Sequence, residues 1–170
     1  MIQLRKTLQT AHETLDKNKI DHALIGGLAL AVYNEDSRST SDIDLLADGN
    51  KKNEIKECLV AAGFNLNYES NEVLQFTGIG FLDVILANRD LTQEMLKKAQ
   101  SRPPFDVHVV RAEDIIGLKI QAYKNDSSRE LQDKADIQKL MRSQNLDLKL
   151  IKKYADLINE WATIQKLVAK

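Results

Sequence analysis

Hydrophobic residues recur with two different periods along the first two thirds of the chain. Apolar positions three or four residues apart over residues 2–17 predict an amphipathic helix. Beyond it, short apolar runs predict strands, and segments of helical pattern lie between them. The predicted strands are residues 22–25, 42–47, 64–69, 72–78, 80–87 and 104–110, and the predicted helices between them are residues 28–33, 51–63 and 91–99.

The chain changes character near residue 111. From there the pattern is helical throughout, with helices predicted at residues 113–124, 128–142 and 147–168. We therefore expect a mixed α/β core over residues 1–110 and a helical C-terminal segment over residues 111–170, together forming one compact unit.

Composition and charge narrow the function only a little. The chain has 170 residues, of which 43% are hydrophobic and 29% are charged, and its net charge is −1. Such a charge argues against a dedicated electrostatic nucleic-acid binder, although residues 111–170 carry 12 basic and 9 acidic side chains. The single Cys58 and an N-terminus interrupted by charges indicate a cytoplasmic protein without a signal peptide or membrane span.

The first candidate for chemistry is the stretch HALIGGLALAVYNEDSRSTSDIDLL, residues 22–46. Asp42 and Asp44 lie two residues apart in a predicted strand, so both side chains point to the same face, with Cα atoms ~6.5–7 Å apart. Adjacent carboxylates favour a bound divalent cation, although a solvated turn gives the same pattern. Gly26 and Gly27 stand between a strand and a helix, where backbone N–H groups can approach a phosphate; a tight turn is the alternative.

Asp83 is the third candidate, because it interrupts an apolar strand. A buried carboxylate needs a partner, which is either a metal ion shared with Asp42 and Asp44 or a helical lysine.

This combination resembles the polymerase-beta-like nucleotidyltransferase superfamily, whose pattern is Gly-Gly or Gly-Ser, then Asp-x-Asp, then an Asp on a later strand. The stretch RSTSDIDLL, with the downstream stretches EDIIGLKIQA and RELQDKADIQKL, looks most like the bacterial abortive-infection and toxin–antitoxin nucleotidyltransferases. The resemblance covers about residues 20–140. The chain departs from the family pattern in two ways. Gly27 stands where a serine is frequent, so either Ser39 or Ser41 supplies the hydroxyl or phosphate binding rests on the backbone alone. The chain is also short for the toxin subgroup.

The resemblance implies a nucleotidyltransferase fold, a mixed sheet flanked by helices, and transfer of an NMP from an NTP such as ATP to an acceptor hydroxyl. It implies Mg²⁺, or else Mn²⁺, as cofactor, RNA as acceptor and a cognate antitoxin protein as partner. Asp42, Asp44 and Asp83 would be both the metal ligands and the catalytic residues. The nucleotide-binding residues would be Gly26, Gly27, Arg38, Thr40, Ser41, Lys119, Asp133 and Asp136.

The downstream candidates also have plainer interpretations. Lys119 either turns toward a triphosphate or faces solvent on an amphipathic helix, and Asp133 and Asp136 either organise the wall of the site or form a helix-surface pair. The three histidines lack the spacing of a zinc site, so we expect them to be structural, and we expect Tyr154 and Trp161 to serve packing.

Two other functions fit the same residues. One is a small-molecule nucleotidyltransferase of the antibiotic-resistance kind, and the other is a non-catalytic nucleotide-binding module on the same scaffold. A basic groove would favour RNA as the acceptor, and an acidic groove would favour a cationic drug.

Overall fold

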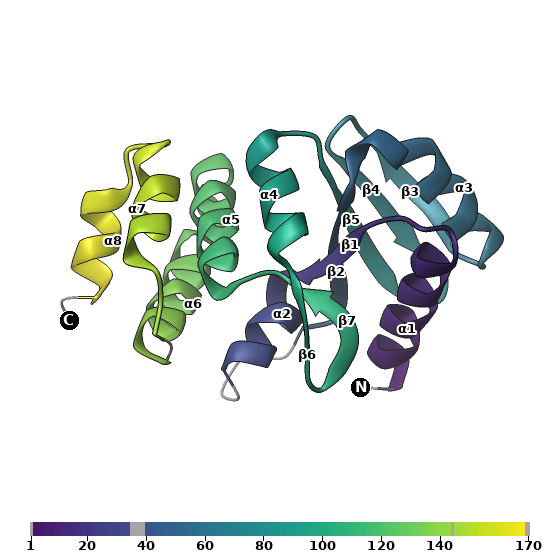
Figure 1. Cartoon of the computed structure of the whole chain (residues 1–170), viewed down its shortest axis with the longest axis horizontal. Coiled ribbons are helices and arrows are strands. Elements are labelled where there is room, and N and C mark those ends of the chain that lie inside the picture. The colour runs from purple at the N-terminus through teal and green to yellow at the C-terminus, as the bar shows by residue number, and fades with distance from the viewer. Residues whose placement is uncertain (1, 35–39, 144, 169–170) are drawn as a thin grey trace. The chain divides into compact units, whose positions relative to one another are not determined.

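A computed structural model describes residues 2–34, 40–143 and 145–168 of the chain (Figure 1). The chain forms two compact units. The first consists of Met1–Ala29 and Arg38–Val110, and the second of Leu30–Ser37 and Arg111–Lys170. No described helix is both long enough and apolar enough to cross a membrane.

The first unit is built on a seven-stranded mixed sheet, which confirms the predicted α/β fold class. The strand order is β3-β4-β5-β2-β1-β7-β6. The parallel pairs are β2 with β5 and β1 with β7, and the remaining neighbours are antiparallel. The strands are β1 (His22–Ile25), β2 (Asp42–Asp48), β3 (Asn65–Glu69), β4 (Val73–Thr77), β5 (Phe81–Ala87), β6 (Gln100–Arg102) and β7 (Phe105–Val109).

The central position of β1, β2 and β5 in the sheet explains how deeply their residues are buried. All four residues of β1 are buried, as expected for a strand with neighbours on both sides and both faces covered. On β2 and β5, buried residues such as Ile43 and Leu82 alternate with half-buried ones, so the opposite face is more open. The more open face carries the polar side chains of both strands.

Helices α1 (Ile2–Lys17) and α3 (Lys52–Ala61) pack against each other on the same sheet (Figure 1). Leu8, Ala11 and Leu15 of α1 are buried, as the helical spacing predicts. Helix α4 (Asp90–Lys98) contacts β2 and β5, and the Gln93 amide donates to Asp48 Oδ1 over 3.1 Å. Helix α2 (Gly26–Tyr33) and the 3₁₀ turn η1 (Gly49–Lys51) complete the elements before residue 110.

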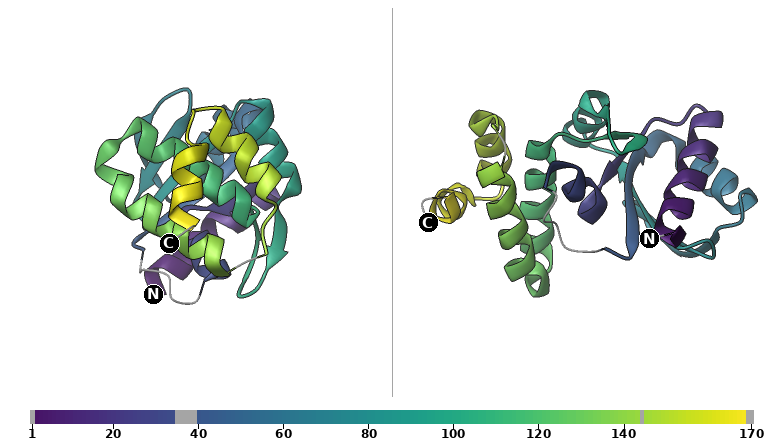
Figure 2. Two further views of the ribbon diagram at one scale, coloured as in Figure 1. Left: turned by 90° about the vertical axis from the view of Figure 1, so that its left-hand side faces the viewer. Right: turned by 90° about the horizontal axis from the view of Figure 1, so that it is seen from below.

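The second unit is helical, and its helices pack side by side (Figure 2). Helix α5 packs on α6 and α7, and α8 packs on α6 and α7. The elements are α5 (Ala112–Asn125), the 3₁₀ turn η2 (Ser127–Arg129), α6 (Glu130–Ser143), α7 (Leu148–Asp156) and α8 (Trp161–Val168).

The sequence-based prediction was wrong at one helix and missed one strand. The helix expected over residues 147–168 is two helices, because Asn159 adopts a left-handed φ of 58° that ends the first of them. The strand β6 was missed, because its sequence Gln-Ser-Arg has no hydrophobic alternation, and it is a strand only through its pairing with β7.

Candidate active site

The two glycines leave space that the site uses. Gly26 follows the last residue of β1 at φ +67°, which favours glycine over every other residue. A β-carbon on Gly26 would lie 1.9 Å from Oδ2 of Asp44, so only glycine allows this carboxylate to lie against the start of α2. A β-carbon on Gly27 would lie 3.0 Å from the Thr40 hydroxyl oxygen. The start of α2 therefore lies beside Asp44 and Thr40 with no side chain between them.

Asp42 and Asp44 occupy alternate positions at the start of β2, and both are half-buried. The Thr40 hydroxyl donates to Asp42 Oδ1 over 2.6 Å, which holds that carboxylate in place. Ile43, between them, is fully buried on the other face. The strand thus orients both carboxylates toward the more open face of the sheet.

Asp83 lies on β5, the direct neighbour of β2. The parallel register places Asp83 opposite Asp44, and cross-strand partners share a face, so all three carboxylates lie on one face of the sheet. The Gln75 amide on β4 donates to Asp83 Oδ2 over 3.0 Å. Its partner is therefore this amide, not the helical lysine considered above.

The electrostatics of Asp83 reflect this surrounding. Burial is the main cause that raises its pKa above the ordinary value of 3.8. The hydrogen bond from Gln75 lowers the pKa in part, and the negative charge of Asp42 raises it again. Like charges therefore act on one another across the two strands.

The donor set suits a hard divalent cation, because it offers only carboxylate oxygens on one face beside a helix start. Within the residues that the structure describes, no three Asp, Glu, His or Cys side chains already surround a single point at metal-binding distance. Mg²⁺ commonly takes one or two protein carboxylates and completes its shell with substrate phosphates and water. Asp42 and Asp44 would supply those two carboxylates, and the positive charge of the cation would offset the repulsion that Asp83 experiences.

The predicted residues of the second unit form a separate buried network. Lys119 on α5 donates to Asp133 Oδ1 over 2.8 Å and to Asp136 Oδ2 over 2.7 Å, both on α6. Arg129 donates to Asp133 Oδ2 over 3.2 Å. The lysine is 6% exposed and the two aspartates are 1% and 3% exposed. Neither a solvent-facing lysine nor a helix-surface pair describes these residues.

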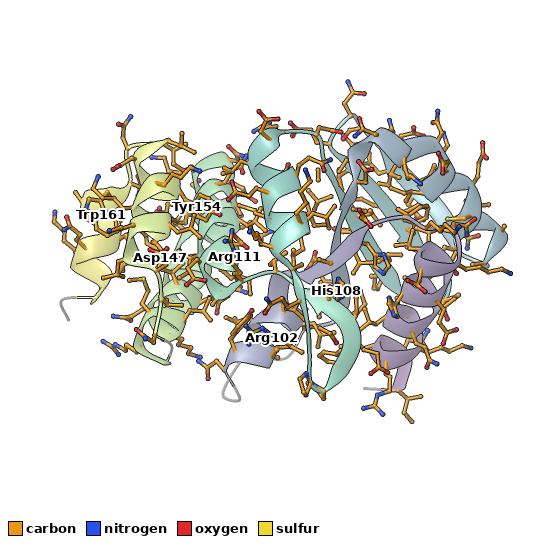
Figure 3. All side chains as sticks on the ribbon, in the orientation of Figure 1. Arg102, His108, Arg111, Asp147, Tyr154 and Trp161 are labelled. Carbon is orange, nitrogen blue, oxygen red and sulfur yellow. The ribbon has the colours of Figure 1, made fainter. Side chains whose placement is uncertain are left out.

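A second network joins α5 to α7 (Figure 3). The guanidinium of Arg111 and the hydroxyl of Tyr154 both donate to the buried Asp114, over 2.8 Å to Oδ2 and 2.6 Å to Oδ1. Hydrogen bonding to this carboxylate raises the pKa of Arg111. Tyr154 also packs on Gly117, where an added β-carbon would lie 2.5 Å from its ring, so the residue has a packing role together with a polar one.

The family follows from comparison with known proteins. Residues 12–166 match the model of a family described as nucleotidyl transferase AbiEii toxin, type IV toxin–antitoxin system. The chain belongs to the AbiEii nucleotidyltransferase family. It is therefore a nucleotidyltransferase, as the resemblance of its motifs to the polymerase-beta-like superfamily implied.

Solved structures show the same fold as this AbiEii-family chain. The antibiotic-resistance factor ANT(2″)-Ia is 17% identical with a TM-score of 0.57, and the match covers 95% of this chain and 87% of that one. An antigenic nucleotidyltransferase-like protein from Paracoccidioides brasiliensis is 19% identical with a TM-score of 0.56, covering 96% and 91%. JHP933 from Helicobacter pylori is 16% identical with a TM-score of 0.55, covering 95% and 75%. No curated protein sequence matches the chain.

Three predicted nucleotide-binding residues and two of the histidines of the AbiEii-family chain remain to be placed. Thr40 and the exposed Ser41 lie immediately before β2, next to Asp42. Arg38, like Ser39, lies outside the described residues. His12 and His22 form a ring-to-ring hydrogen bond of 2.8 Å, and burial is the main cause that lowers the pKa of His22.

Gln75, the hydrogen-bond partner of Asp83, was not among the predicted site residues. Its signal was present in the pattern, because a polar residue alternates with buried Leu74 and Phe76 in β4. Selecting it required the pairing of β4 with β5, where Gln75 is opposite Asp83.

Proposed function

We propose that this AbiEii-family enzyme moves an NMP from an NTP to a hydroxyl of an RNA acceptor, with Mg²⁺ or Mn²⁺ as cofactor. The single observation that carries the proposal is the register of β2 and β5, which puts Asp83 opposite Asp44 and beside Asp42. The family's description as part of a type IV toxin–antitoxin system supports a toxin role with a cognate antitoxin as protein partner.

Each residue has a separate role in the proposed reaction. Asp42 and Asp44 would hold the cation, which neutralises phosphate charge when bound. The start of α2 at Gly26 and Gly27 would hold the β and γ phosphates with backbone N–H groups. Because its raised pKa makes its carboxylate a stronger base, Asp83 would accept the proton of the acceptor hydroxyl.

In the proposed reaction, one bond to the α phosphorus forms while another breaks. The acceptor oxygen forms a bond to the α phosphorus as the bond from that phosphorus to the bridging oxygen breaks, and pyrophosphate leaves with that oxygen. The proton of the acceptor hydroxyl goes to Asp83. Positioning and charge neutralisation would supply most of the rate enhancement.

Nucleotide binding by the other predicted residues is part of the same proposal. Thr40 would act by fixing the Asp42 carboxylate through its 2.6 Å hydrogen bond, and Arg38 and Ser41 would contact phosphate. Lys119, Asp133 and Asp136 would support the helices of the second unit without contacting the nucleotide, because the lysine ammonium is paired with both carboxylates and all three residues are buried.

The test is incubation with each of the four labelled NTPs, Mg²⁺ and total cellular RNA. We expect label to enter RNA with the wild type and not with Asp42→Asn, which removes the charge but keeps the shape and a hydrogen-bond acceptor for Thr40. Asp156→Asn on α7 is the matched control, because it makes the same substitution at an exposed carboxylate that pairs with Lys152 and lies outside the site. Label passing to an aminoglycoside or lincosamide in place of RNA would favour the small-molecule enzyme, and no transfer to any acceptor would favour the binding module.

A further inference from the structure

A cavity of about 600 Å³ lies at the end of the sheet where β2 and β5 begin and β4 ends. Its wall includes Leu4 and Thr7 of α1, Thr40 and Ser41 before β2, and Phe81, the first residue of β5. Thr40 also donates to Asp42, so the cavity and the carboxylate site share one wall. Its volume suits one small organic group and not a duplex.

Phe81 is the unusual residue of this wall. Its side chain is 61% exposed although it belongs to a central strand of the sheet. It is paired with Asp42 across the strands and lies two positions before Asp83, so it shares the face of the carboxylates at a distance of ~6.5–7 Å along β5. An exposed aromatic ring beside catalytic carboxylates lacks a packing explanation.

Among the residues that the structure describes, none that lines the cavity carries a charged side chain. A phosphate backbone would need lysine or arginine there, and a polycationic drug would need carboxylates. Hydroxyl groups and an aromatic ring instead suit a neutral, planar group that stacks and forms hydrogen bonds, which describes a nucleobase.

The order of the strands assigns this cavity to the acceptor. Gly26 follows β1 on one side of β2, whereas Phe81 and Asp83 belong to β5 on the other side. If the triphosphate lies at Gly26 and Gly27, the acceptor must approach from the β5 side to bring its hydroxyl to Asp83.

We infer that this cavity is the acceptor subsite, where the terminal nucleobase of a single-stranded RNA stacks on Phe81 and places its ribose hydroxyl toward Asp83. This inference rests on the proposed function for the identity of the reaction. The stacking itself needs neither metal nor NTP, so it can be measured separately from turnover.

The binding experiment uses fluorescence. Trp161 is the only tryptophan, so a Phe81→Trp variant made in a Trp161→Phe background carries a single indole, at the proposed platform. Titration with a short single-stranded RNA, without metal or NTP, should quench this indole as bases stack on it. Tyr68→Trp in the same background is the matched control, because Tyr68 is 53% exposed on β3, outside the cavity lining, and should show no saturable quenching.

The kinetic experiment uses variants of the otherwise wild-type protein, in which Trp161 is kept. Phe81→Ala should raise the KM for RNA by roughly 5- to 150-fold, the size of one lost stacking contact, and leave the KM for NTP within about twofold. Phe81→Tyr should restore the KM for RNA. Tyr68→Ala should change neither constant.

Four results would overturn or separate the two ideas. Equal quenching at positions 68 and 81, or an unchanged KM for RNA in Phe81→Ala while Asp42→Asn abolishes transfer, would refute the subsite and leave the proposed function standing. Saturable quenching by RNA at position 81 without any transfer to RNA would support the subsite and refute the transfer reaction. Quenching by a lincosamide or aminoglycoside, and not by RNA, would refute the nucleobase as occupant.

Discussion

Replacing Gly26 by alanine should destabilise the first unit and disable the site together. Gly26 has a φ of +67°, and a left-handed backbone costs a residue other than glycine about 1–2 kcal/mol. The new β-carbon would also lie 1.9 Å from Asp44 Oδ2 and 2.8 Å from its Cβ, so that Asp44 must move. Such overpacking typically costs about 1–3 kcal/mol. We therefore expect Gly26→Ala to lower the free energy of unfolding by about 2–5 kcal/mol.

Gly27→Ala is the control. Gly27 lacks a left-handed φ, and a β-carbon there would lie 3.0 Å from Thr40 Oγ1. Alanine at a helical position contributes about 0.5–1 kcal/mol over glycine, which offsets the tight contact. Urea unfolding followed by circular dichroism should give a clear difference between the two variants.

A double-mutant cycle separates the two causes. In an Asp44→Ala background the contacts to the carboxylate are gone, so Gly26→Ala should cost less there, leaving mainly the cost of the backbone conformation. Activity should fall about 10²-fold or more in Gly26→Ala, since a carboxylate displaced by about 1 Å misplaces the reacting groups. A destabilisation no larger than that of Gly27→Ala, with Asp44-dependent activity intact, would refute the close approach.

Two other changes test the electrostatics of each unit. Asp83→Asn should stabilise the first unit at neutral pH while abolishing transfer, because a raised pKa in the folded state means that the ionised carboxylate costs stability above that pKa. This gain should shrink as pH falls through the raised pKa toward 3.8, which urea unfolding as a function of pH measures; a gain independent of pH would contradict it. In the second unit, Lys119→Met should cost about 3–5 kcal/mol by leaving Asp133 and Asp136 buried without its ammonium, and adding Asp133→Asn and Asp136→Asn should recover most of the loss. A loss below about 1 kcal/mol in thermal or urea unfolding would show that the network is not the main link between α5 and α6.

Local patterns predicted the fold well where each residue's own neighbours decide its structure. The spacing of Leu8, Ala11 and Leu15 gave α1, and alternation around Ile43 gave the common face of Asp42 and Asp44. The break at Asn159 was invisible, because apolar residues continue at helical spacing on both sides of it. A single asparagine is too weak a signal to end a predicted helix.

Contacts between distant elements could not be predicted in this way. The opposition of Asp83 and Asp44 depends on β5 pairing with β2 instead of with another strand, which no local pattern specifies. Lys119 looks like an exposed lysine in its own helix, and only the packing of α6 against α5 shows that it is buried. Charged residues on amphipathic helices usually face solvent, so the local pattern pointed the other way.

The Asp83 carboxylate costs the folded protein stability, and this cost bears on the function of the site. Asparagine at position 83 would keep a hydrogen-bond acceptor for Gln75 without the cost of an ionised carboxylate near Asp42. A packing role therefore gives no reason for an aspartate there, whereas a proton acceptor or a metal ligand requires one. Gly26 differs, because its φ of +67° already favours glycine on folding grounds, and its missing side chain also leaves Asp44 against the start of α2. A cost such as that of Asp83 is expected where function, not folding, selects the residue, and it occurs at a carboxylate that the proposed reaction uses.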